Sequence, residues 1–266
     1  MAQSSPASAE SLRVGGIVPD FDAETTQARL SSRLRTFLFA FPDDFTPVAT
    51  TELASFTELQ SEFAQRHVKL FALSTNNTRN RKGHFEPHEK WVKDINEISE
   101  TPLMFPIISD ADGSISLAFN VYSASLDESD ADAVKADDAV GEGLAFKSRT
   151  VFIIDDQKRL RLLFNYPAAV GMNTAEVLRV IDCLQTARRA DVRTPANWIP
   201  GGVVIVPPKY DDEAAKKKFP EFKVVKPYLR FYSLPEEKTN VAQIQDLSEK
   251  DAAQFLAVGD EPQIST

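Results

Sequence analysis

Apolar runs of strand length alternate along the first half of the chain with stretches that have helical periodicity. Three runs have the length of a buried strand, and they stand at residues 36–41 (TFLFAF), 68–74 (VKLFALS) and 105–110 (FPIISD). Between the first two, residues 47–66 form one predicted helix, with Leu53, Phe56, Leu59 and Phe63 on a single face. Pro47 fits its first turn, where no backbone N–H is needed.

The pattern continues with helices and a hairpin. Residues 88–98 (HEKWVKDINEI) and 114–121 (SISLAFNV) are predicted helices, and residues 149–166 predict two strands around a turn at 155–158. Residues 173–187 predict an amphipathic helix, with an N-cap at Asn173 and a glutamate three residues later. This order of elements predicts an α/β fold, a sandwich of helices around a mixed sheet.

Changes in amino-acid composition along the chain indicate four segments. Residues 1–13 are small and polar and predict a flexible N-terminal arm, and residues 14–190 hold the main α/β domain. Residues 191–235 are rich in proline, with short strands and one charged helix, and predict a small C-terminal α+β domain. Residues 236–266 are polar and acidic, which indicates a mobile tail or an arm that contacts a partner.

Composition and charge narrow the possible partners. The chain has 266 residues, 42% of them hydrophobic, and a formal net charge of -9. That charge argues against nucleic acid or an anionic membrane as the main partner, because both reward clustered Lys and Arg. No apolar run reaches the length of a transmembrane helix, and the polar N-terminus lacks the patterns of a secretory signal or a transit peptide. We therefore expect a cytoplasmic protein.

Cysteine and histidine are scarce. Cys183 is the one cysteine, so neither an intramolecular disulfide nor a cysteine cluster for zinc is possible. It lies in an amphipathic segment, and we interpret it as a small buried hydrophobe rather than a reactive thiol. His84 and His88 have the spacing of a helical metal pair, but Pro87 indicates that a helix begins between them. We expect the solvent-exposed start of a helix there, with no metal and no cofactor.

The loop FPDDFTPVATTEL, residues 41–53, carries the candidate chemistry. It resembles the active-site loop of the peroxiredoxins, in which a proline is followed after three residues by threonine and after two more by cysteine. Pro42 and Thr46 match this pattern, and Ala49 occupies the position of the peroxidatic cysteine. Arg149, in RTVFIIDDQKRLRL, matches the arginine that faces the thiolate.

Later motifs carry the resemblance further along the chain. YPAAVGMN, TPANW, GGVVIVPP and YLRFYSLP resemble the one-cysteine subclass of peroxiredoxins, which has an additional C-terminal domain. The resemblance spans about residues 14–233. It implies a thioredoxin-like fold and a homodimer, with the C-terminal domain near the active site of the partner.

The resemblance also implies roles for the matched residues. In family members the cysteine thiolate attacks the O–O bond of a peroxide and becomes a sulfenic acid. A helix N-terminus and an arginine favour the thiolate, a threonine hydroxyl and backbone N–H groups hold the peroxide, and the proline excludes water. On this basis the Thr46 hydroxyl would hold the peroxide, and Pro42 would exclude water from the site. Glu52 would pair with Arg149 and orient it.

Several residues depart from the family pattern. Ala49 has no thiol, so peroxidase chemistry cannot run at this position, and Cys183 belongs to a distant helix in the family fold. Phe41 stands where many members have histidine, and Met172 stands where the family has a second arginine. Phe41, Ala49 and Met172 would make the pocket more apolar than that of the family, and Val48 is a further candidate pocket residue.

Asp43 is a further departure, with two interpretations. The first is a solvent-facing carboxylate in a turn. The second is a general acid or base in a pocket with Thr46 and Arg149. The sequence leaves both open.

Three functions fit these observations. The first is a naturally divergent member that performs non-peroxidase chemistry on, or binds, a small organic molecule such as a hydroperoxide. The second is a thiol-dependent peroxidase in which the cysteine at position 49 was replaced by alanine in the laboratory. The third is a dimeric regulatory pseudoenzyme that recruits a partner through its acidic tail. We favour the first, because one engineered substitution would not explain the changes at Phe41, Asp43 and Met172.

Overall fold

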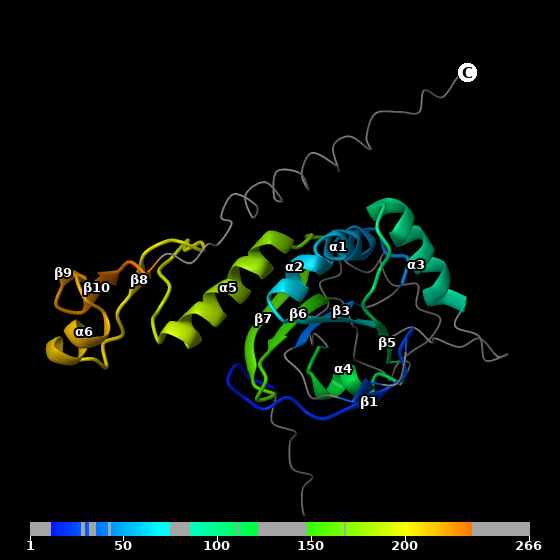
Figure 1. The fold of residues 1–266 in the computed structure, drawn as a ribbon. Coiled ribbons are helices and arrows are strands. Elements are labelled where there is room, and N and C mark those ends of the chain that lie inside the picture. Colours follow the sequence, from blue (N-terminus) through cyan, green and yellow to red (C-terminus); the bar gives the residue numbers. More distant parts are fainter. Residues whose placement is uncertain are drawn as a thin grey trace, which may run out of the picture. The chain divides into compact units, whose positions relative to one another are not determined.

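A computed structural model describes residues 12–27, 30–31, 36–41, 44–74, 86–110, 112–121, 148–167 and 169–235. The chain divides into two compact units, one up to Met172 and one from Asn173 (Figure 1). These units are defined by internal contacts, so the family domains expected at 14–190 and 191–235 stay a prediction. Within the described ranges, no helix is long and apolar enough to cross a membrane.

A five-stranded mixed sheet forms the centre of the first unit, in the order β5-β4-β3-β6-β7. The parallel strands are β3 (Thr36–Phe41), β4 (Lys69–Ser74) and β5 (Ile107–Ser109). Strand β6 (Ser148–Ile154) runs antiparallel to β3, and β7 (Leu160–Pro167) forms the predicted hairpin with it. The mixed sheet expected from the sequence is therefore confirmed. A two-stranded ribbon of β1 (Asp22–Ala23) and β2 (Leu30–Ser31) accompanies it.

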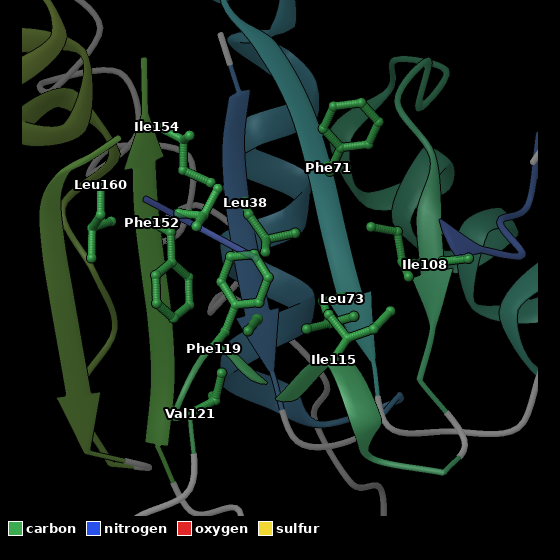
Figure 2. Packing of buried hydrophobic residues seen from close by; sticks show 13 residues of the cluster. Leu38, Phe71, Leu73, Ile108, Ile115, Phe119, Val121, Phe152, Ile154 and Leu160 are labelled. Atoms are coloured by element: carbon green, nitrogen blue, oxygen red, sulfur yellow. The ribbon is translucent and has the colours of Figure 1, made fainter. Parts of the chain in front are cut away.

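Helices cover both faces of this sheet. Figure 1 shows α1 (Pro47–Glu58), α2 (Gln60–Gln65) and α3 (Glu86–Ser99) on one side and α4 (Ser114–Ala118) on the other. Successive residues of a strand point to opposite faces. Accordingly Leu38 and Ala40 of β3 belong to the α4-side cluster (Figure 2), whereas the ring of Phe39 lies 5.6 Å from that of Phe56 on α1.

The single helix predicted for residues 47–66 is wrong in one respect, because it is interrupted at Leu59. At this break the side-chain amide of Gln60 donates to the carbonyl of Pro102 at 2.9 Å and accepts from the N–H of Met104 at 3.0 Å. A contact with a segment more than 40 residues away thus fixes the start of α2, and periodicity alone carries no sign of it.

The second unit begins with α5 (Thr174–Ala190), whose predicted cap is confirmed because Asn173 Oδ1 accepts from the Glu176 N–H at 3.1 Å. A small antiparallel sheet of β8 (Val204–Ile205), β10 (Leu229–Tyr232) and β9 (Lys223–Lys226) follows, together with α6 (Asp212–Lys218). A separate core, built around Trp198 and Phe219, holds these elements together.

Candidate functional site

Ala49 lies in the first turn of α1 and is completely buried. Thr46 has extended backbone angles and Pro47 opens the helix, so the chain turns into α1 directly after β3 and its short loop. The N-terminal turn of a helix presents unpaired N–H groups and the positive end of the helix dipole. The alanine methyl group places no acceptor and no nucleophile there.

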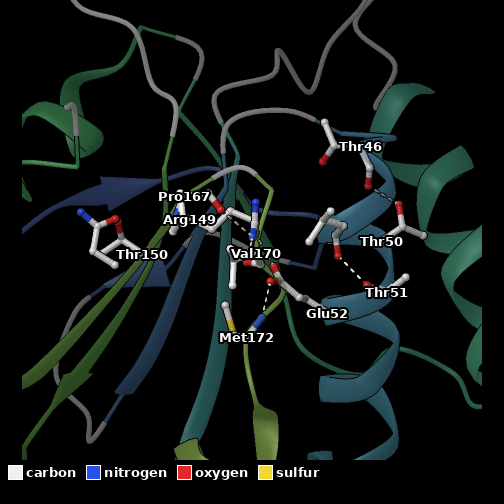
Figure 3. Close-up of polar contacts among 11 residues, drawn as sticks. Thr46, Thr50, Thr51, Glu52, Arg149, Thr150, Pro167, Val170 and Met172 are labelled. Atoms are coloured by element: carbon white, nitrogen blue, oxygen red, sulfur yellow. Dashed lines mark hydrogen bonds and ion pairs between the residues drawn. The ribbon is translucent and has the colours of Figure 1, made fainter. Parts of the chain in front are cut away.

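A buried ion pair lies one helical turn further on. Glu52 is on the same face of α1 as Ala49, and its Oε2 accepts from Nε of Arg149 at 2.8 Å. Both side chains are almost completely excluded from solvent. The pair therefore joins α1 to β6, as Figure 3 shows.

The segment after β7 closes around this pair. Arg149 Nη2 donates to the carbonyl of Pro167 at 3.2 Å and to that of Val170, while the N–H of Met172 donates to Glu52 Oε1 at 2.9 Å (Figure 3). A Cβ atom added to Gly171 would lie 3.8 Å from Val48 Cγ1, which places this segment against the first turn of α1. Three parts of the chain thus meet at one charged pair.

Burial raises the pKa of Glu52 above its ordinary value of 4.5. The Arg149 guanidinium and the Met172 N–H lower that pKa but only partly offset the loss of water around the carboxylate. In the ionised form, the anion of Glu52 and the cation of Arg149 neutralise each other within the site. Its charge is therefore balanced without a thiolate at position 49.

Hydroxyl groups and aromatic rings organise the opposite side of α1. Thr50 Oγ1 donates to the carbonyl of Thr46 at 2.8 Å and accepts from the Trp91 indole N–H at 2.9 Å. The ring of Phe41 lies 5.1 Å from that of Trp91 and is fully buried. Phe45, in the left-handed region with φ 58°, keeps its ring half-exposed and 6.2 Å from the same indole. Aromatic side chains therefore flank the loop that leads into α1.

The solvent-exposed start of a helix expected at His88 is wrong. His88 is buried, and its Nδ1 bonds to Oδ2 of Asp44, whose Oδ1 accepts from Ser74 Oγ at 2.8 Å. His88 Nε2 is buried and has no hydrogen-bond partner in the described part of the chain. Sequence spacing could not reveal this pairing, because its members are 44 residues apart.

The predicted site residues thus fall into two groups. The structure brings together Glu52, Arg149 and the backbone of Met172, with Val48 against the same segment, and it places Thr46 and Phe41 on the loop side. Pro42 and Asp43 lie outside the described residues, so both interpretations of Asp43 stay predictions. The catalytic and binding roles of the whole set also stay predictions.

Cys183 lies in the second unit, where it is half-buried against the Trp198 core. Arg179 Nη1 donates to its Sγ at 3.3 Å, but burial raises the pKa of the thiol. A raised pKa favours the neutral thiol over the nucleophilic thiolate. Within the described residues, no group of three or more His, Cys, Asp or Glu side chains is arranged to hold a metal ion.

Models of two known families match parts of the chain, one in each unit. The model of the AhpC/TSA family matches residues 14–163, and that of the C-terminal domain of 1-Cys peroxiredoxin matches residues 183–221. The chain is 41% identical over 226 residues to mitochondrial peroxiredoxin PRX1 of Saccharomyces cerevisiae, covering 83% of this chain and 80% of that protein. It is 36% identical over 234 residues to the 1-Cys peroxiredoxin of Medicago truncatula, covering 83% and 97%.

Two solved structures are also similar. The yeast mitochondrial 1-Cys peroxiredoxin has a TM-score of 0.72 and 40% identity, over 84% of this chain and 99% of that one. A mutant of the Peroxiredoxin 6 of Arenicola marina has a TM-score of 0.71 and 33% identity, over 85% and 100%. The similarity therefore extends through the greater part of both units.

The raised pKa of Glu52 predicts a direction for the pH dependence of stability. The folded chain holds this proton more tightly than the unfolded chain does. The contribution of Glu52 to the free energy of unfolding is therefore fully present below pH 4.5, and it is lost as the pH rises through the raised pKa of the folded chain. Urea unfolding of the native chain and of Glu52→Gln should show the difference in unfolding free energy falling with pH. If the difference in unfolding free energy grew with pH instead, the attraction of Arg149 for the carboxylate would outweigh the effect of burial. The matched control is Glu62→Gln, at a partly exposed glutamate of α2.

The Asp44–His88 pair predicts that two substitutions differ in stability. His88→Leu leaves the buried carboxylate without its imidazole and should cost about 3 kcal/mol. His88→Asn retains an N–H donor near the position of Nδ1 and should cost about 1.5 kcal/mol, mainly for the lost ring volume. Urea unfolding at neutral pH measures both values. Equal losses would show that packing of the ring, and not its bond to Asp44, stabilises this region.

Proposed function

This chain belongs to the one-cysteine peroxiredoxins of the AhpC/TSA family, and we propose that it has lost thiol-peroxidase chemistry and binds or transforms a small organic molecule, such as a hydroperoxide, without reducing it. Its fold is thioredoxin-like, with an additional C-terminal domain. The observation that carries the proposal is a fully buried alanine at position 49 in a chain that also has Phe41 and Met172 in place of polar residues of the family.

Peroxide reduction needs a sulfur at this position. The thiolate gives an electron pair to one peroxide oxygen, the O–O bond breaks, the sulfur becomes a sulfenic acid and the other oxygen leaves as an alkoxide or hydroxide. Ala49 has no electron pair to give. Cys183 is a poor replacement, because burial raises its thiol pKa and so disfavours the nucleophilic thiolate.

The remaining side chains favour an apolar ligand with one polar end. Phe41 stands where many members have a histidine and Met172 where the family has a second arginine, so apolar side chains replace two polar ones. Thr46 stays at the start of α1, and Arg149 stays at the end of β6 that faces it. A hydroperoxide or hydroxyl group near Thr46, with its hydrocarbon part toward the aromatic residues, fits this distribution.

Assembly and location are parts of the same proposal. We infer a homodimer from family membership, with a small molecule rather than nucleic acid or membrane as the ligand. A cytoplasmic location stays a prediction. A similar yeast protein is named as mitochondrial, and that name describes the yeast protein and not this chain.

A thiol peroxidase with alanine substituted at position 49 is the second candidate. The intact Glu52–Arg149 pair favours it, since this pair is the frame that supports a thiolate in the family. The two candidates differ in what a restored cysteine would do.

The Ala49→Cys variant should stay folded and consume no hydrogen peroxide beyond the level of the native chain when a thiol reductant is supplied. The reason is that a cysteine alone does not restore the polar groups missing at Phe41 and Met172. Ala49→Ser is the control for size, and Ala49→Cys combined with Cys183→Ala excludes the second thiol. A kcat/KM of about 10⁴ M⁻¹s⁻¹ or more would establish the second candidate instead.

Ligand binding is tested on the native chain with cumene hydroperoxide as an apolar probe. We expect saturable shifts of the Thr46 and Ala49 amide resonances, while the hydroperoxide concentration stays constant. Phe41→His, which returns a polar ring to this position, should weaken binding. Shifts that do not saturate, or that are equal in the variant, would contradict the ligand proposal and leave a pseudoenzyme scaffold.

A further inference from the structure

Strand β9 leaves one edge of the second unit's sheet open. It pairs with β10 and with no other strand in the described part of the chain, so its outer N–H and C=O groups have no ladder partner there. All four of its residues, Lys223 to Lys226, are exposed. An open strand edge of this kind is a template for another extended segment.

The side chains of β9 define what fits the edge. Val224 and Val225 are 62% and 56% exposed, and Tyr228 at the following turn is 74% exposed. The register between β9 and β10 shifts between Leu229 and Arg230, which lie opposite Lys226 and Val224, so Val225 is the extra residue of a β-bulge and has no residue opposite it on β10. Both valines are more than half exposed and are adjacent on the edge strand, so an extended segment running along this edge would contact both.

The charges on β9 indicate that a segment bound along its edge would be negatively charged. Lys223 and Lys226 stand at the two ends of β9 and bracket the valines. An acidic segment with a few apolar residues matches this order of side chains, and such complementarity also selects against basic segments.

The chain supplies such a segment. Residues 236–266, which lie outside the described residues, contain seven acidic residues and two lysines, with apolar residues that include Val241, Ile244 and Leu247. They follow three residues after the end of β10, and Phe231 of β10 lies opposite Lys223 in the register. The outer edge of β9 is about two strand spacings, about 10 Å, from that point, and three or four extended residues span it.

We propose that the acidic C-terminal segment, residues 236–266, docks along the open edge of β9. Its acidic side chains pair with Lys223 and Lys226, and its apolar side chains cover Val224 and Val225. The connection within one chain gives an effective concentration in the millimolar range, so weak contacts suffice. This docking is independent of what the first unit binds.

Amide hydrogen exchange tests the proposal on the β9 amides that do not bond to β10. Exchange should be about tenfold slower in the full chain than in a chain that ends at Pro235. A peptide of residues 236–266 added to the shortened chain should restore the protection. In the full chain, Lys223→Glu with Lys226→Glu should remove it, whereas Lys216→Glu with Lys217→Glu, the same charge change on α6, should not.

Two results would overturn the proposal. Equal exchange in the full and shortened chains would show that the tail does not cover β9. Protection that persists in the shortened chain and grows with protein concentration would assign the edge to a second copy of the chain. The charge-reversal pair gives an answer in the full chain even where the shortened one folds poorly.

Discussion

The buried ion pair between Glu52 and Arg149 is the interaction on which the rest of the site depends. Two charges removed from water are tolerated only when each has a close partner and further hydrogen bonds. Here the backbone supplies those bonds through the Met172 N–H and the carbonyls of Pro167 and Val170. One pair therefore fixes α1, β6 and the segment after β7 in a single arrangement.

This constraint explains how the chain keeps the architecture of a peroxidase without its sulfur. A site that balanced arginine against a thiolate alone would hold an uncompensated buried cation once the cysteine was gone. In this chain Glu52 already provides the counter-charge, and Ala49 is small enough to be buried without a polar partner. An alanine at position 49 thus leaves the electrostatics of the frame intact, and the fold does not depend on a thiolate there.

Sequence patterns predicted the elements whose signals are local. The apolar runs of β3 and β4, the β6–β7 hairpin and the cap at Asn173 were predicted because strand length, turn position and cap spacing are written in neighbouring residues. The break at Leu59 and the burial of His88 escaped prediction because both depend on partners about 40 residues away. Long-range polar contacts of this kind override a local preference and leave no periodic trace.

The aromatic packing beside α1 limits how the site could return to peroxidase chemistry. Phe41 shares its face of β3 with Phe39, and it packs edge-on against Trp91, whose indole in turn holds Thr50. A polar side chain at position 41 would have to find a hydrogen-bond partner within this apolar contact, since an unpaired polar group there costs about 1–3 kcal/mol. The residue at position 41 is therefore coupled to the packing of α3 against α1, the helix whose first turn carries Ala49. Our proposal that a cysteine alone does not restore the reaction depends on this contact.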